Sequence, residues 1–211
     1  MSIFPPYGDP MLTGAVNLPA LTGDPDGSLP ERLTAILNVV GQQANLARLT
    51  DKLWVVGQNI PVLIQAVPAT AVWPAANDAI AVPFIPPRDM TVTAMIIQLH
   101  STVANNMDLG LYTAAGAKVR TTGATAQSGS ASVRQRVALA VGNAALAGGA
   151  LYYAVMAMDN TTGGTLRFAP AVGLAHAIGI AKQATAYPLP TSLTLATPTA
   201  AFSPVLILEE A

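Results

Sequence analysis

The chain has 211 residues, of which 52% are hydrophobic and only 10% are charged. This length suits one domain of ordinary size, or a small domain with an extended or helical appendage, and such a composition excludes disorder of the highly charged kind. The net charge is −1, so no nucleic-acid partner is expected, because phosphate binding needs concentrated cations. The absence of cysteine excludes disulfides and thiolate metal sites. A surface with so few charges favours a chain that is covered by copies of itself or by other subunits.

Residues 1–29 contain five prolines and four glycines and show no sustained hydrophobic period. This composition predicts an extended arm. The first ten residues, MSIFPPYGDP, have neither the basic start nor the apolar run of a secretory signal. We therefore expect the protein to be made in the cytoplasm.

Residues 30–60 are predicted to form one long helix. Ser28 is a suitable N-cap, Pro30 and Glu31 suit a first turn, and no further proline occurs before Pro61. Alternating steps of three and four residues define the seam of a coiled coil, and its positions are Ile36, Val39, Gln43, Leu46, Thr50 and Leu53. The two polar positions would fix register, which favours a parallel self-associating bundle. A helix lying across the chain's own sheet is the alternative.

Residues 66–211 show short apolar runs separated by Pro, Gly, Asn and Thr. The predicted strands are Ala79–Phe84, Thr91–His100, Asp108–Thr113, Lys118–Thr122, Ser132–Val141, Ala150–Met158, Thr165–Phe168, Leu174–Ala181 and Val205–Glu209. This spacing is typical of an antiparallel β-sandwich or jelly roll. The predicted fold is thus mainly β, with an extended arm, an oligomerising helix and a β-sandwich domain in chain order.

One uncharged stretch, Val137–Met158, is long enough to span a bilayer. It contains the turn signals Gly142-Asn143 and Gly148-Gly149, and its flanks alternate in polarity. We interpret it as two strands and a loop, and expect no membrane insertion.

The sequence offers little catalytic chemistry. Its two histidines, His100 and His176, lie far apart with no carboxylate next to either, and no nucleophile elbow, phosphate-binding loop, dinucleotide fingerprint or zinc-protease motif occurs. We expect no enzymatic activity and no cofactor or metal.

Four residues are candidate surface or ligand contacts: Tyr112, Tyr152, Asp108 and Asp159. Consecutive tyrosines at 152 and 153 place one ring on each face of a strand, and one of these faces must meet solvent or a partner. The two aspartates lie near Asn105, Asn106 and Asn160 at predicted strand ends. This pattern favours turn capping, with a calcium site as the alternative.

Several segments resemble a β-sandwich module of tailed-bacteriophage virion proteins, namely fibre, spike and head-decoration components. They are Trp73–Phe84, Asp108–Gly116 with Thr122-Gly123, Leu146–Ala154 and Met158–Thr162. The shared elements are a D-x-G-x-Y hairpin and a G-x-Y-Y strand. This chain has Thr113 where related modules tend to carry an acidic residue after the hairpin tyrosine.

The resemblance implies a virion component, assembled in the bacterial cytoplasm and forming a homotrimer. It implies a short fibre or spike in which the arm anchors to capsid, neck or tail proteins, the helix trimerises and the head is displayed, with host-surface glycans as the ligand class considered for the head. The alternative is a capsid cement or decoration protein that stabilises the head lattice. A glycan-degrading enzyme has no support in the residues.

Overall fold

The computed structural model describes residues 52–56, 69–168, 175, 177–197 and 202–211. All of them belong to one of the two compact units into which the chain divides, Lys52–Ala211, which we call the β-domain. The predicted arm, residues 1–29, lies outside the described residues, as does most of the predicted helix. Of the three expected segments, the described residues cover the C-terminal one and only the last part of the helix.

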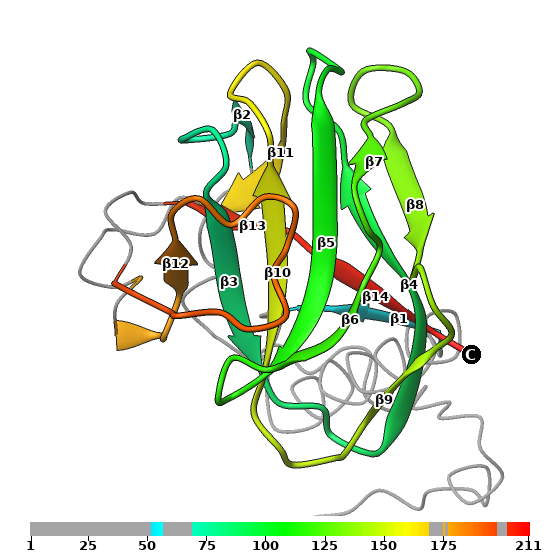
Figure 1. Cartoon of the computed structure of the whole chain (residues 1–211). Coiled ribbons are helices and arrows are strands. Elements are labelled where there is room, and N and C mark those ends of the chain that lie inside the picture. The colour runs from blue at the N-terminus through cyan, green and yellow to red at the C-terminus, as the bar shows by residue number, and fades with distance from the viewer. Residues whose placement is uncertain (1–51, 57–68, 169–174, 176, 198–201) are drawn as a thin grey trace, which may run out of the picture. The chain divides into compact units, whose positions relative to one another are not determined.

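The described residues of the β-domain form fourteen strands, and every pairing between these strands is antiparallel. A six-stranded sheet contains β12 (Ala181–Gln183), β3 (Ala79–Phe84), β10 (Tyr152–Met158), β5 (Asn106–Thr113) and β6 (Lys118–Thr121), with β7 (Thr125–Ala126) beside β5. A five-stranded sheet contains β1 (Leu53–Val55), β14 (Ile207–Glu210), β4 (Met90–Gln98) and β8 (Arg134–Ala138), with β9 (Ala144–Leu146) beside β4. Strands β13 (Ser203–Pro204), β11 (Gly164–Phe168) and β2 (Ala69–Val72) form a smaller third sheet (Figure 1). The prediction of a mainly β fold with antiparallel sheets is confirmed.

Strand β10 shows how the sequence builds two buried layers. Its residues alternate between a larger core cluster, which contains Ala154, Met156 and Met158, and a smaller one, which contains Val155 and Ala157. The larger cluster also holds side chains of β3, β5, β4 and β14, so it is shared by the six-stranded and five-stranded sheets. A strand buried on both faces has no polar alternation, and this explains the uncharged run that includes β10.

The smaller cluster lies on the other face of the six-stranded sheet, beneath residues 185–195, which we call the strap. Leu189 and Leu193 of the strap pack there against Ala81 and Val155, and Figure 1 shows the strap, in orange, crossing β3 and β10. The sheet residues are small because the strap approaches closely: a Cβ added at Gly110 would lie 2.9 Å from the Leu189 side chain. The C-terminal third of the chain thus supplies a cover for a second apolar face.

The helix predicted over residues 30–60 is not seen among the described residues, and it is wrong at its C-terminal end. Leu53 belongs to β1, where it pairs with Glu209, and Trp54 pairs with Leu208. Leu53-Trp54-Val55 is rich in residues that favour strands, and the Trp54 side chain packs against the larger core. Pairing with a distant strand therefore overrides the local heptad spacing at these residues.

Other local predictions can be compared with the strands directly. Ala79–Phe84 coincides with β3, and the β5–β6 hairpin turns at Gly116, whose φ is 78° and whose N–H donates to the Thr113 carbonyl at 2.9 Å. The strand predicted over 174–181 is wrong, because Gly179 has a φ of 80° and extended pairing begins only at Ala181. Six strands of two to four residues, β1, β2, β7, β9, β12 and β13, were not predicted, since such short segments carry no measurable alternation.

The uncharged stretch at residues 137–158 contains the end of β8, all of β9 and all of β10. The two expected strands are present, but the expected loop between them contains a third short strand, β9. Among the described residues, no helix is both long and apolar enough to cross a membrane.

Candidate functional site

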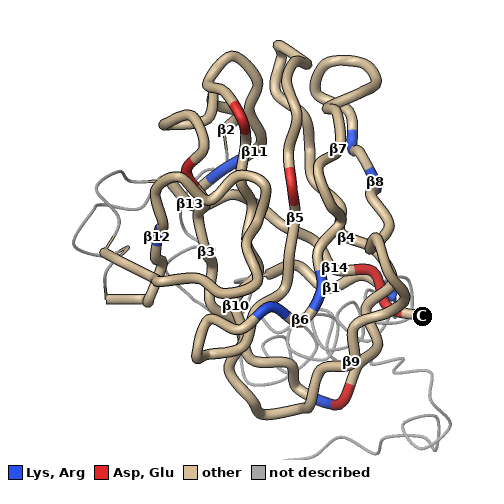
Figure 2. Tube along the Cα trace, in the orientation of Figure 1, with Lys and Arg blue, Asp and Glu red and all other residues tan. Residues whose placement is uncertain are grey.

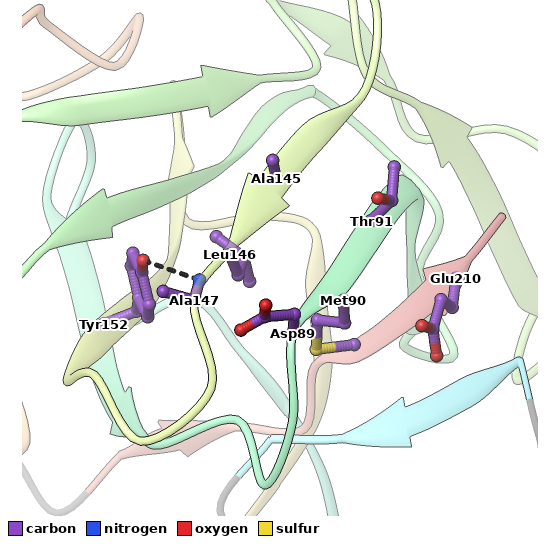
Figure 3. Close-up of a pocket in the computed structure, with 8 residues that line it drawn as sticks. All are labelled: Asp89, Met90, Thr91, Ala145, Leu146, Ala147, Tyr152 and Glu210. Atoms are coloured by element: carbon purple, nitrogen blue, oxygen red, sulfur yellow. Dashed lines mark hydrogen bonds between the residues drawn. The ribbon is translucent and has the colours of Figure 1, made fainter.

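The β-domain has an open surface hollow of about 440 Å³ where four strands of distant sequence meet. Its lining comes from the start of β4, the end of β9, the start of β10 and the end of β14, and we call it the Asp89 hollow (Figure 3). The lining residues are Asp89, Met90, Thr91, Ala145, Leu146, Ala147, Tyr152 and Glu210. Antiparallel pairing of β4 with β9 places Met90 opposite Leu146 and Thr91 opposite Ala145, which joins the two walls in a fixed register.

Asp89 is exposed at the edge of this hollow, just before β4. One carboxylate oxygen, Oδ1, accepts a hydrogen bond from the Gly148 N–H at 2.7 Å. Within the described part of the chain, the other oxygen has no hydrogen-bond partner. The backbone at Gly148 cannot carry a larger residue, because an added Cβ would lie 2.6 Å from the Arg88 carbonyl carbon. The close approach of these two loops therefore fixes the carboxylate beside the hollow.

Tyr152 is half-buried and contributes both a ring and a hydroxyl. Its oxygen accepts a hydrogen bond from the Ala147 N–H at 3.0 Å (Figure 3), which leaves the hydroxyl hydrogen for another partner. The ring packs against Phe84 of β3 with their centroids 6.0 Å apart. The ring is thereby held at the edge of the larger core.

Glu210 lines the hollow on the β14 side and forms an ion pair with Arg88. The Arg88 guanidinium contacts both carboxylate oxygens of Glu210, with Nη2 to Oε2 at 2.7 Å. Charged residues are sparse over the rest of the β-domain, as Figure 2 shows. The hollow therefore combines a neutralised carboxylate with a second carboxylate, that of Asp89, which forms no ion pair with any described residue.

Two of the predicted surface contacts are wrong, because the structure buries them. Tyr112 is fully buried in the smaller cluster and its hydroxyl donates to the Pro190 carbonyl oxygen at 2.6 Å. Asp108 is 2% exposed; its carboxylate accepts hydrogen bonds from the Leu189 N–H at 3.0 Å and from the Thr122 hydroxyl at 3.3 Å. Both residues lie under the strap, whose cover the sequence did not predict.

Burial dominates the electrostatics beneath the strap. It raises the pKa of Asp108, against the opposing effect of the hydrogen bonds from Leu189 and Thr122 and of the Lys118 charge. Burial, together with the Asp108 charge, also raises the pKa of Tyr112. Both groups serve to hold the strap on the sheet.

Asp159 follows β10 and ties it to the start of β5. Its two carboxylate oxygens accept hydrogen bonds from the Asn106 backbone N–H at 3.0 Å and from the Asn106 side-chain amide at 2.8 Å. Because Asn106 lies 53 positions away in the chain, Asp159 links the ends of two strands, and these hydrogen bonds are not the local turn capping that was expected. Among the described residues, no three His, Cys, Asp or Glu side chains are grouped in a way that could hold a metal ion.

The structure does not bring the predicted contacts together in one site. Tyr152 alone lines the Asp89 hollow, while Asp108 and Tyr112 lie on the opposite face of the six-stranded sheet. Of the predicted oligomerisation residues, Leu53 is in β1, and the others, Ile36, Val39, Gln43, Leu46 and Thr50, lie outside the described residues.

Sequence reasoning missed three polar residues of the hollow: Asp89, Thr91 and Glu210. One signal was present, since charged residues are scarce in this chain and adjacent ones occur at Arg88-Asp89 and Glu209-Glu210. Their meeting, however, depends on the pairing of β14 with β4. Comparison of the sequence with protein-family models found no match, and comparison with curated proteins found none.

Proposed function

We propose that this protein is a structural component of a virion, a homotrimeric short fibre or spike whose β-domain is a sandwich-type head. The observation that carries the proposal is the division of the chain after Asp51 into two compact units. An attachment segment followed by an independently packed β-domain is the organisation that such a component needs. The sequence resemblance to phage virion modules supports the same assignment.

In this proposal, residues 1–29 attach to capsid, neck or tail proteins and the seam from Ile36 to Thr50 joins three chains. Because Leu53 already belongs to β1, the trimerising helix ends before Lys52. The head then starts at β1, in the five-stranded sheet. The protein acts without an enzymatic step, and its location is the virion, after assembly in the host cytoplasm.

Deletion of residues 1–29 tests the anchoring role. Particles assembled with the shortened chain should lack the protein, as judged by immunoblotting of purified virions, while the shortened chain stays soluble and trimeric. Incorporation at the level of the full chain would contradict the anchoring role. Circular dichroism of the shortened chain is the control for misfolding, because a folded chain should retain the β spectrum of the head.

A cement or decoration protein of the capsid is the second candidate, and exposed apolar residues of the β-domain favour it. Ile85 and Leu151 are 49% and 40% exposed; Ile85 directly follows Phe84, and Leu151 directly precedes Tyr152, the residue that pairs with Phe84. They thus form a small apolar edge that a neighbouring subunit could cover. Particles lacking the protein should be fragile to heat or osmotic shock if it is a cement, and sturdy but poor in adsorption if it is a fibre.

A further inference from the structure

We propose that the strap is a removable cover of the six-stranded sheet, and that the edges beneath it, β12 and the start of β6, form a surface through which a second copy of this chain pairs. This goes beyond the proposed function, since it requires neither the arm nor the helix. Three features carry it: the hydrogen bonds that cover the two edges, the way the strap is held, and the charge on each edge.

One edge is covered at the start of β6. Ser192 of the strap forms an antiparallel bridge with Ala117, and the Thr191 carbonyl oxygen accepts a hydrogen bond from the Lys118 N–H at 3.0 Å. The far end of β6 is bonded elsewhere, to the Ala140 N–H. Removal of the strap would therefore uncover the start of this edge.

The opposite edge of the sheet is covered by Ala196, directly after the strap. Its backbone exchanges two hydrogen bonds of 2.8 Å with Lys182, the middle residue of β12. Successive residues of an antiparallel strand direct their backbone groups to opposite sides, so Lys182 is the residue of β12 that points away from β3. This one contact thus satisfies the outward backbone groups of the whole three-residue strand.

The strap is held by few regular contacts for a segment that covers an apolar face. All of its residues are described, and Ser192 is the one residue among them that forms a β-bridge. Its large buried side chains are Leu189 and Leu193. Its first residue, Thr185, is β-branched and has a φ of 55°, a strained conformation for such a residue. A segment of this kind opens more easily than the strands it covers, and opening uncovers the smaller cluster together with both edges.

The charges on the two edges favour the pairing of unlike edges. Lys118 and Arg120 of β6 form no ion pair with any described residue, so two β6 edges would repel each other. Lys182 of β12 is neutralised by Asp78, with Nζ and Oδ2 3.4 Å apart. An uncovered β12 can therefore pair with the β6 of a second copy. Because this contact joins two different surfaces, it does not close at a dimer, and further copies can add.

A disulfide can lock the strap in place, because the chain has no cysteine of its own. Ala117 and Ser192 are both exposed, and they form a non-hydrogen-bonded pair between the bonds of Lys118 and Leu193. Such pairs have Cα atoms about 4.5 Å apart, within the range of about 4.4–6.8 Å for disulfides. The full chain with Ala117→Cys and Ser192→Cys should thus have a fixed strap when oxidised and a free one when reduced.

Leu189→Ala in this two-cysteine chain loosens the strap and leaves the sheet unchanged. In the reduced state at gently raised temperature, its mass by light scattering should grow about tenfold faster than that of the two-cysteine chain alone, since truncation of a buried leucine shifts a local equilibrium by at least that factor. Oxidation should abolish the growth. Leu193→Ala repeats the test if Leu189→Ala does not fold, as judged by circular dichroism.

Leu146→Ala in the same two-cysteine chain is the matched control. It truncates a leucine of the larger cluster that is 2% exposed, so it lowers the stability of the domain without loosening the strap. Its mass should grow no faster than that of the two-cysteine chain in either redox state.

Growth that the disulfide does not prevent, or equal growth of Leu146→Ala, would show that general unfolding drives association and would overturn the proposal. Constant mass of the reduced, folded strap variants, or growth that stops at a dimer, would also overturn it. Failure of the two cysteines to cross-link would contradict the bridge on which it rests. Growth is measured relative to the starting mass of each chain, so none of these results depends on the homotrimer.

Discussion

The Asp108 carboxylate, in the interior of β5, accepts a hydrogen bond at 3.0 Å from the backbone N–H of Leu189, which is 81 residues later in the chain. This contact lies beneath the strap and beside the Tyr112 hydroxyl bond to Pro190. Two polar residues of one strand thus fasten a non-regular segment over an otherwise apolar face. The strap is therefore part of the folded core, and its anchors can be tested one at a time.

The Asp108 contact predicts a specific pH dependence. Burial raises the folded-state pKa of Asp108 above its ordinary value of 3.8, so the folded chain binds this proton more tightly than the unfolded chain does. The stabilisation from protonation is complete below 3.8 and is lost as the pH rises through the folded pKa. Asp108→Asn removes this titration, and an amide retains an acceptor for the Leu189 N–H.

The measurement is urea unfolding of both proteins at a series of pH values from acid to neutral. The free energy of unfolding of the unchanged chain should fall relative to that of Asp108→Asn as the pH rises through this window. A difference that stays constant, or one that changes in the opposite direction, would contradict the assignment of the raised pKa.

Tyr112→Phe should destabilise the β-domain by about 1–2 kcal/mol, because it leaves the Pro190 carbonyl without its buried donor. Tyr153→Phe is the matched control, since Tyr153 packs against the same cluster and its hydroxyl forms no hydrogen bond with any described residue. Chemical denaturation of the two variants measures the difference. Equal costs would show that the Tyr112 hydroxyl does not anchor the strap.

Gly116 combines a left-handed backbone with a close approach of the strap. Its φ is 78°, and an added Cβ would lie 2.3 Å from the Leu193 carbonyl oxygen. Gly142 has a φ of 64° with no atom within 4 Å of such a Cβ, so Gly142→Ala reports the backbone cost alone, about 1–2 kcal/mol. Gly116→Ala should cost about 1–3 kcal/mol more. Thermal denaturation that ranks the two variants equally would exclude close packing of the strap on this turn.

The Arg136–Glu209 pair joins β8 to β14 across β4 through two hydrogen bonds of 2.7 Å. The side-chain hydrogen bond from Arg136 lowers the pKa of Glu209 below its ordinary 4.5. The pair's contribution is thus present above that value and is lost as the pH falls through the folded pKa. A double-mutant cycle with Arg136→Gln and Glu209→Gln should give a coupling of about 0.5–1 kcal/mol, reduced by salt. A coupling that does not change with salt would contradict an exposed ionic interaction.

Elements that depend on neighbouring residues in the chain could be predicted from the sequence, whereas elements that depend on distant pairing could not. Alternation and turn residues sufficed for β3 and for the β5–β6 hairpin, since these elements are set by neighbours in the chain. The strand identity of Leu53 could not be obtained in this way, because its partner Glu209 lies 156 positions away. From the sequence alone, a heptad spacing that runs into a strand by chance cannot be told from the spacing of a true coiled coil.

The candidate site also depends on strand pairing between distant parts of the chain. Tyr152 stood out by its place in a paired-tyrosine strand, whereas Asp89, Thr91 and Glu210 become neighbours only through the pairing of β4 with β9 and β14. Tyr112 and Asp108 were misplaced because the strap that buries them has few strand or helix signals. Its residues nevertheless include the apolar pair Leu189 and Leu193, which indicates a covered face.

The mass of the full chain in solution, measured by light scattering, tests the central claim most directly. We expect three times the 21.6 kDa of one chain, and a shift to lower mass for Leu46→Asp, which places a charge in the proposed seam. Asn45→Asp, one residue outside the seam, should remain a trimer. A full chain that scatters as a single 21.6 kDa molecule at all concentrations would contradict the homotrimeric fibre.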